Sequence, residues 1–408
     1  SKNDQGKTVS TGILRIAHIS NIIPLTKAFF ELNINQDHAE SYALNIVPYH
    51  ESQLLLLRSV LEKRLDRILN RQNEEAIFNQ PEIKRALEKS DAKHHIFMII
   101  ASPVIEVGRD IDVNWAISEP SSMGSLIQLC GRVLRHRADK IPIAPNIGVL
   151  NSSIRAKLTP DLIGYCNPGF EDADHRLVKN WADEHFKYLF RADEIAIIDS
   201  IPRIIKVSEN TETPVGRSRR GRRASTAAPV LKVHYLSTLE HSVLHDLYFK
   251  GRNEGACYND MNIFSASGSA SHLYGDLQMR TRFRESHGED RRYILFPVEE
   301  IKRREIEIAE LKFVTYASIE DYKTWFNMRV EDTYEQFVSS KEMDVIPVVD
   351  NEYVRPWLVP DVREEFDKVC RYFKNRSPRN NAIQFLMVSL DSKYQYDFNA
   401  WLGFSLRK

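Results

Sequence analysis

Two arginines three residues apart, Arg132 and Arg135, are the side chains of this sequence best suited to chemistry. They follow a glycine in the segment Gln128-Leu129-Cys130-Gly131-Arg132-Val133-Leu134-Arg135. On one helix this spacing places both guanidinium groups on the same face. Their rigid, permanently charged forks suit a polyphosphate. The segment therefore predicts a helix that presents two arginines to a nucleotide phosphate.

A second segment, at 101–112, reads ASPVIEVGRDID and follows the apolar run HIFMIIA. A small hydroxyl and a glycine at the end of a strand let backbone amides approach a phosphate, and an aspartate can accept from a ribose or orient an arginine. Alone this pattern is common in turns, but it stands one strand and one turn before Gln128. The two segments together predict a nucleotide site of Gly108, Asp110, Gln128, Arg132 and Arg135, with Ser102 as a candidate contact for a nucleic-acid backbone.

The sequence shows no complete phosphate-binding loop for these arginines to face. The nearest match is Gly6-Lys7-Thr8, but Ser1 stands where the pattern needs its first glycine, which favours a terminal tail. No Asp-Glu-x-His or Asp-Glu-x-Asp box occurs either. We therefore expect half of a bipartite site, in a fragment that is inactive alone because another domain must bring ATP and magnesium.

Composition describes an ordinary globular chain. Its 408 residues favour two or three domains, with 42% hydrophobic and 27% charged residues and a net charge of zero. Long apolar runs and a signal-peptide core are both missing, which predicts a cytoplasmic protein without a membrane partner. The four cysteines form no Cys-x-x-Cys pair, which argues against a disulfide framework or zinc ribbon, and no metal site is expected in this sequence.

The first 200 residues alternate short apolar strands with helices. Strands are expected at 13–19, 42–49, 95–101, 113–119 and 146–151, and helices at 23–33, 51–72 and 122–136. This alternation predicts an α/β domain over 1–200, with a parallel sheet covered by helices on both faces. Ligands of such sheets gather at the carboxyl ends of the strands, where both segments would lie.

The remaining residues change in character twice. Residues 201–229 are polar and predict a flexible linker, whose five arginines either hold nucleic acid electrostatically or form a solvated, self-repelling chain. Residues 230–408 predict a mostly helical domain, with helices at 297–313 and after Pro360. The aromatics near the C-terminus favour core packing over base stacking. The linker arginines are Arg217, Arg219, Arg220, Arg222 and Arg223.

The pattern S-P-V-x-E-x-G-x-D-I-D, then a strand, then Q-x-x-G-R-x-x-R resembles motifs V and VI in the second RecA-like domain of superfamily 2 helicases. Together with VPYHESQLLLLRSVLEKRLDRIL upstream, it is most similar to the CRISPR-associated helicase-nucleases of type I systems, in the type I-F form fused to an integration-complex subunit. Tyr49-His50 and Arg58 match residues around that family's long helix. The resemblance covers 13 to about 200 well.

The resemblance implies a RecA-like fold in which Arg132 and Arg135 reach the γ-phosphate of ATP held with magnesium by a first RecA-like domain. It also implies a C-terminal lid over 230–408, an HD nuclease with a divalent metal elsewhere in the protein, and cleavage of invader DNA. Expected partners are single-stranded DNA, the RNA-guided surveillance complex, CRISPR integration proteins and phage inhibitors. Two alternatives stay open: a general superfamily 2 DNA or RNA helicase, and a nonenzymatic docking module for CRISPR proteins or phage inhibitors.

Overall fold

The computed structural model describes residues 2–31, 41–158, 198, 290–315 and 353–406, except 4, 138, 303, 304, 392 and 395. These residues fall into two units, each described by itself. The first comprises Ser1–Ser118, Gln128–Val149 and Ser286–Lys408 as far as they are described, and the second contains Glu119–Ile127 and the start of Leu150–Glu285. All six strands of the parallel sheet belong to the first unit.

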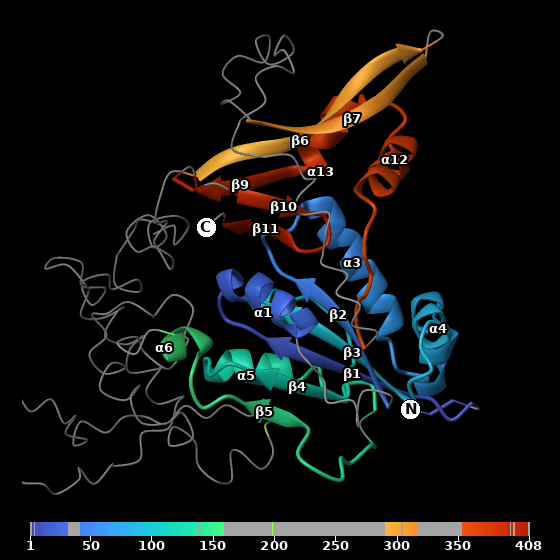
Figure 1. Cartoon of the computed structure of the whole chain (residues 1–408), viewed down its shortest axis with the longest axis vertical. Helices are drawn as coiled ribbons and strands as arrows, with labels where there is room; N and C mark the ends of the chain where they lie inside the picture. Colours follow the sequence, from blue (N-terminus) through green and yellow to red (C-terminus); the bar gives the residue numbers. More distant parts are fainter. Residues whose placement is uncertain are drawn as a thin grey trace, which may run out of the picture. The chain divides into compact units, whose positions relative to one another are not determined.

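A six-stranded parallel sheet organises the first unit (Figure 1). The strand order is β5-β4-β1-β3-β2-β8, which confirms the predicted α/β fold. The edge strand β8 comes from the C-terminal part of the chain and pairs with β2. The strands are β1 Thr8–Arg15, β2 Tyr42–Tyr49, β3 His94–Ala101, β4 Trp115–Ser118, β5 Ile147–Val149 and β8 Val354–Pro356.

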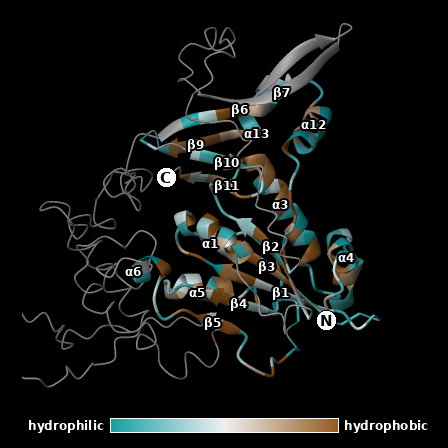
Figure 2. Ribbon diagram, in the orientation of Figure 1, coloured by the Kyte–Doolittle hydropathy of each residue, from teal (hydrophilic) through white to brown (hydrophobic). Residues whose placement is uncertain are grey.

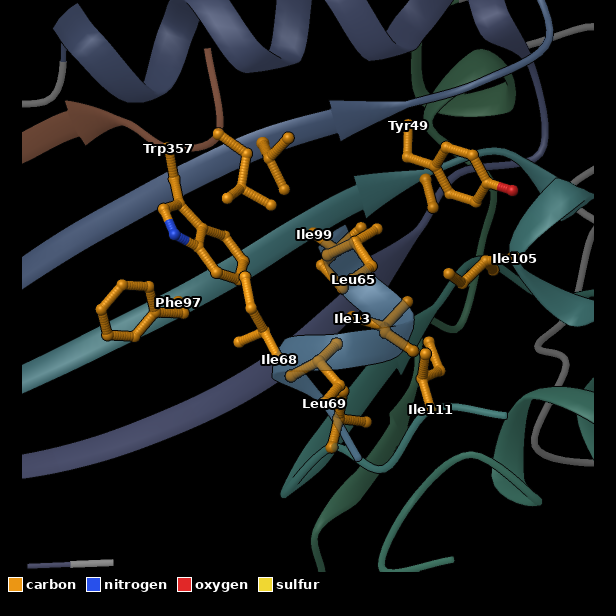
Figure 3. Close-up of a cluster of buried hydrophobic side chains, with 14 of the residues drawn as sticks. Ile13, Tyr49, Leu65, Ile68, Leu69, Phe97, Ile99, Ile105, Ile111 and Trp357 are labelled. Carbon is orange, nitrogen blue, oxygen red and sulfur yellow. The ribbon is translucent and has the colours of Figure 1, made fainter. Parts of the chain in front are cut away.

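Both faces of the sheet are buried, because residues that alternate along each strand are apolar on either side. On one face Ile13 and Ile99 pack with Leu65 and its neighbours (Figure 3). On the other, Met98 and Ile100 of β3 are buried where α1 packs. Figure 2 shows the resulting brown central strands. The covering helices are α1 Ile19–Glu31, α3 Leu55–Ile68 and α4 Pro81–Glu88.

The carboxyl ends of four neighbouring strands lie at one level. Arg15, the last residue of β1, is in register with Ala101 of β3 and with Ser118 of β4. Tyr49, the last residue of β2, is in register with the same Ala101. Loops that leave these strands therefore start side by side, which positions the candidate site.

The C-terminal residues contain more strands than the sequence suggested. The predicted helix at 297–313 is wrong, because this stretch lies in two antiparallel strands, the first of which also pairs with residues 387–391 through its residues 290–294. The sequence Glu305-Ile306-Glu307-Ile308 alternates charged and apolar residues, which is a strand pattern. The strands are β6 Asp290–Lys302, β7 Glu305–Thr315, β9 Met387–Asp391, β10 Tyr396–Asn399 and β11 Gly403–Leu406.

Two helices accompany these strands, α12 Val362–Tyr372 and α13 Pro378–Phe385. The helix predicted after Pro360 is confirmed, and Asp361 caps it by accepting from Glu364 N. The expected core packing is confirmed for Trp401 and Phe404, which are buried, but it is wrong for Tyr394, which is 51% exposed. The predicted linker at 201–229 lies outside the described residues. Within the described ranges, no helix is long and apolar enough to cross a membrane.

Candidate functional site

The loop that follows β3 forms the first part of the site. Ser102 accepts from Val104 N and so caps a short 3₁₀ helix, Pro103–Glu106. The serine is buried, so its hydroxyl is not presented to solvent. Gly108 then adopts a φ of 68°, a left-handed conformation that favours glycine. The loop therefore turns sharply at Gly108 and exposes the residues around it.

The second segment does not form the helix that the sequence predicted. Helix α5, Met123–Cys130, ends before both arginines, so Arg132 and Arg135 do not share a helical face. The chain instead pairs with the end of the first loop: Val113 N donates to Arg132 O and Leu134 N donates to Val113 O, both at 2.9 Å. Gly131 just past the helix is a common stop signal that could have revealed this.

Arg132 points inward and is only 5% exposed. Its Nη2 donates to the carbonyl oxygen of Glu106 at 2.8 Å. The Glu106 carboxylate in turn accepts from Nε of buried Arg15 at 2.7 Å. Burial, followed by the nearby Arg135 charge, lowers the pKa of Arg132. This arginine thus fastens the second segment to the first loop and to the end of β1.

Arg135 lies at the surface, with 44% of its side chain exposed. Its Nε donates to Asp110 Oδ1 at 2.6 Å, and His136 Nε2 lies 3.1 Å from the same oxygen. Hydrogen bonds from His136 and then Arg135 lower the pKa of the Asp110 carboxyl. Because His136 Nδ1 accepts from Arg71 N, the ring proton lies on Nε2 and points to Asp110. Asp110 therefore orients an arginine, one of the two roles expected for it.

Sequence reasoning missed a third contact between the two segments, the ion pair of Arg137 with Asp112. Arg137 binds Asp112 through two bonds, Nε to Oδ2 at 2.9 Å and Nη2 to Oδ1 at 2.6 Å. Arg137 is 5% exposed and Asp112 is fully buried. A signal was present, because Asp110-x-Asp112 and Arg135-x-Arg137 carry opposite charges at the same spacing.

Arg109 of the same loop turns toward α3. Its Nη2 lies 2.5 Å from Glu62 Oε2, and its Nη1 donates to Asp66 Oδ2 at 3.1 Å. The hydroxyl of Tyr49 donates to Glu62 Oε1 at 2.8 Å, and burial raises the pKa of that hydroxyl. Figure 3 shows the Tyr49 hydroxyl directed away from the apolar cluster. The loop is thus fixed to α3 as well as to the second segment.

The structure brings most of the predicted site residues together. Glu106 and Asp110 of the first loop contact Arg132 and Arg135 directly, and Gly108 lies between them. Gln128 lies in the last turn of α5 with an exposed side chain. The linker arginines fall outside the described residues. No cluster of three metal-ligating side chains occurs within the described part of the chain.

The second segment lies beside the start of β4 and not, as predicted, at the carboxyl ends of the strands, because it pairs with Val113. The arrangement can bind an anion there. One guanidinium, that of Arg135, is exposed and held through its Nε side by a carboxylate. The other two arginines of the second segment, Arg132 and Arg137, are buried and hold the loops together. Such a site offers one charged fork on a rigid support, which suits a phosphate.

Comparison with known proteins gives consistent matches. Residues 9–138 match the family model for the C-terminal part of the CRISPR-associated nuclease/helicase Cas3. The chain is 36% identical over 301 residues to the CRISPR-associated nuclease/helicase Cas3 subtype I-F/YPEST of Pectobacterium atrosepticum, covering 72% of this chain and 24% of that protein. It is 39% identical over 205 residues to the protein of the same name from Pseudomonas aeruginosa, covering 50% and 18%.

Among solved structures, that of T. fusca Cas3 aligns with 36% of this chain and 15% of its own, with 17% identity and a TM-score of 0.27. The chain spans 24% and 18% of the lengths of the two curated relatives.

Proposed function

This chain matches the C-terminal portion of the CRISPR-associated nuclease/helicase Cas3, subtype I-F/YPEST, and we propose that it forms the second RecA-like half of an ATP-driven motor. The motor would move along single-stranded DNA and deliver it to a nuclease domain during CRISPR interference. The observation that carries the proposal is the exposed guanidinium of Arg135, which is held by Asp110 in the loop that follows the parallel strand β3.

In the proposed mechanism Arg135 binds the γ-phosphate of ATP. A first RecA-like domain of the same protein would hold the nucleotide and its magnesium. The negative charge that develops during phosphoryl transfer would then lie against the fork. Arginines in this role elsewhere raise the rate about 10³- to 10⁵-fold. Asp110 keeps the side chain oriented before the nucleotide arrives, which reduces the conformational freedom lost on binding.

Arg132, which is buried in the structure, is proposed to support this step by moving toward the phosphate of ATP. Its Nε is buried and has no hydrogen-bond partner among the described residues. A phosphate near the surface would therefore offer Arg132 a better partner than Glu106 O alone. Movement of Arg132 toward ATP would release the loop 102–112, which carries Ser102, Gly108 and Asp110. ATP binding and the grip of this loop on a DNA backbone would be coupled in that way.

Ser102 is proposed to act through the loop's shape, because its hydroxyl is buried as an N-cap. The proposed site also includes Gln128, whose exposed amide adjoins the arginine segment in sequence. Apart from the magnesium that accompanies ATP, a divalent metal is proposed only for the nuclease domain. The proposed partners are single-stranded DNA, the RNA-guided surveillance complex, integration proteins and phage inhibitors.

The test is DNA-stimulated ATP hydrolysis by the full-length protein with Arg135→Ala. We expect turnover to fall about 10³-fold or more, while single-stranded DNA binding in the absence of nucleotide changes by less than about twofold. Arg135→Lys should recover only part of the activity, because it restores a charge but not the fork. Arg85→Ala, which removes an exposed arginine from α4, is the matched control and should be active.

Near-normal ATPase in Arg135→Ala would contradict the proposal. A second measurement uses the 408-residue chain alone, which we expect to hydrolyse no ATP because no phosphate-binding loop was found in its sequence. Turnover by the purified chain that Arg135→Ala abolishes would show that the nucleotide site is complete within these residues.

A further inference from the structure

The turn between α12 and α13 concentrates positive charge in a neutral chain. From residue 368 to residue 390 the sequence contains five basic residues and no acidic one, although the whole chain has 56 of each sign. An ordinary solvated surface intersperses both signs. The basic residues are Arg371, Lys374, Arg376 and Arg379, together with Lys368, which is ion-paired with Glu364 and Glu365 of α12.

An aromatic ring stands exposed within this charge. The side chain of Tyr372 is 81% exposed, so it adds little to the core. Its ring meets the edge of Phe373, with centroids 4.8 Å apart. Phe373 itself stacks on Phe385 of α13 at 5.6 Å. Phe373 therefore fixes the turn, while Tyr372 projects from that support with most of its surface free.

The cations around the ring are held differently. The guanidinium of Arg376 lies over Phe373, 4.9 Å from the ring centroid, and donates to Gln384 Oε1. Arg371 Nε donates to Asp367 O within α12. Lys374 is exposed and makes no hydrogen bond or ion pair with the described part of the chain. Cations often stabilise the last turn of a helix, but this explanation covers Arg371 alone. It does not account for the exposed Lys374 or for the large exposed part of the Tyr372 ring.

We propose that residues 371–376, the α12–α13 turn surface, bind single-stranded nucleic acid by stacking one base on Tyr372 and pairing neighbouring phosphates with the cations. Proteins that hold single strands without reading their sequence combine these two elements, an aromatic platform and a positively charged track. An acidic protein segment would use the charges but would gain little from an exposed tyrosine ring. The ring therefore decides between the two classes of partner.

This inference rests on the proposed function, which supplies the single-stranded DNA, but it assigns a DNA contact outside the nucleotide site. The two can fail separately. Arg135→Ala, which is expected to stop ATP hydrolysis, should leave binding at this turn unchanged. Substitutions at the turn should weaken the strand contact without altering ATP hydrolysis at saturating DNA.

The experiment measures binding of a fluorescent 20-nucleotide thymidine oligomer to the full chain by anisotropy. Tyr372→Ala should weaken binding about fivefold or more, the effect of losing one stacked base. An abasic oligomer of equal length should show no such loss, because it offers phosphates without bases. Tyr372→Phe keeps the aromatic face and should bind like the unchanged chain.

The charges are tested through salt dependence. Arg371→Ala combined with Lys374→Ala should reduce the slope of log affinity against log salt by about 1.4, which corresponds to two phosphate contacts on a single strand. The matched control, Lys84→Ala with Arg85→Ala, removes two exposed cations from α4 and should leave the slope unchanged. An oligomer carrying 5-iodouracil should form a photocrosslink to the peptide that contains Tyr372.

Three results would overturn the proposal. One is equal affinity of the thymidine oligomer for Tyr372→Ala and the unchanged chain. Another is an equal loss on the abasic oligomer, which would show a phosphate surface without stacking. The third is competition by polyglutamate that is as effective as that by the oligomer, which would favour an acidic protein partner. Circular dichroism of each variant separates loss of binding from loss of fold.

Discussion

The site contains two layers of ion pairs that use the same residue types in different surroundings. In the inner layer, Asp112 with Arg137 and Glu106 with Arg15 are almost entirely shielded from water. In the outer layer, Asp110 with Arg135 is 65% and 44% exposed. Asp110 and Asp112 lie two residues apart, as do Arg135 and Arg137. Each of the two short segments thus uses one charged side chain to hold the loops together and another at the surface, where it can face a ligand.

The difference follows from solvation. Removing one partner of a buried pair leaves the other charge without water or a counterion, at a cost of about 3–5 kcal/mol. An exposed pair contributes about 0–1 kcal/mol, because water replaces the lost partner. Residues of the inner layer should therefore affect stability first, and residues of the outer layer should affect function while the fold persists.

The largest expected effect is that of Arg137→Met. It removes two charged hydrogen bonds from fully buried Asp112, which keeps the bond from His136 N and the nearby charge of buried Arg71, so the free energy of unfolding should fall by about 3 kcal/mol. Urea unfolding followed by circular dichroism measures this change. The double variant Arg137→Met with Asp112→Leu removes both charges and should recover much of the loss. A loss below about 1 kcal/mol in the single variant would show that the inner layer is solvated.

Glu106→Gln should have the next largest effect. The amide keeps an acceptor for Arg15 Nε but removes the charge opposite a fully buried guanidinium, so unfolding should become easier by about 2–3 kcal/mol. The same urea titration measures it. Glu88→Gln on α4, where the side chain is exposed, is the control and should change stability by less than about 0.5 kcal/mol. Equal effects in both variants would abolish the distinction between buried and exposed carboxylates.

His50 extends the comparison to a buried group without a counterion. Burial lowers the pKa of this ring to about 4, and its Nε2 donates to Leu402 O at 2.7 Å. Between the folded pKa and the unfolded value of about 6.5 the unfolded chain binds the extra proton, so stability is full above that range and falls as pH falls through it. This group should lower the free energy of unfolding by about 2 kcal/mol between pH 7 and pH 5.

Denaturant titrations at several pH values measure that slope. His50→Gln should be less stable at pH 7 but should lose less stability on acidification than the unchanged chain. His95, whose pKa burial also lowers to about 4, should keep a residual slope in this variant. An unchanged slope in His50→Gln would mean that His50 is not the group responsible.

The smallest expected effect on stability belongs to Arg135→Ala. Its partner Asp110 is well solvated, so the free energy of unfolding should change by less than about 1 kcal/mol. Thermal unfolding in low and high salt measures this, since salt should reduce even that difference. A loss comparable to that of Arg137→Met would place Arg135 in the inner layer and contradict the division proposed above.

Much of the sheet could be predicted from the sequence because its strands are short apolar runs. The stretch 42–49 was placed within its observed bounds, since β-branched and aromatic residues there are flanked by polar ones. The helix predicted over Arg132 and Arg135 is wrong. The local spacing of apolar residues favoured a helix, but in the structure the backbone of this segment pairs with Val113 instead. Non-local backbone bonds of this kind leave little trace in local periodicity.

The site was predictable in its residue types but not in its layering. Arg132 and Arg135 belong to the same motif, yet one is 5% exposed and the other lies at the surface. Burial depends on which loop packs above each side chain, and the sequence carries no direct record of that. The matched spacing of Asp110 and Asp112 with Arg135 and Arg137 was the one local pattern that could have revealed the pairing.

The edge strand β8 has a consequence for synthesis of the protein. Val354 completes the sheet beside Leu44, and His50 meets Leu402, which lies 352 residues later. On a ribosome adding about 5–20 residues per second, strand β2 waits tens of seconds for its outer neighbour. Contacts so distant in sequence slow folding. During that interval the edge of β2 offers unpaired backbone groups to other chains, which makes the nascent chain a natural client for chaperones.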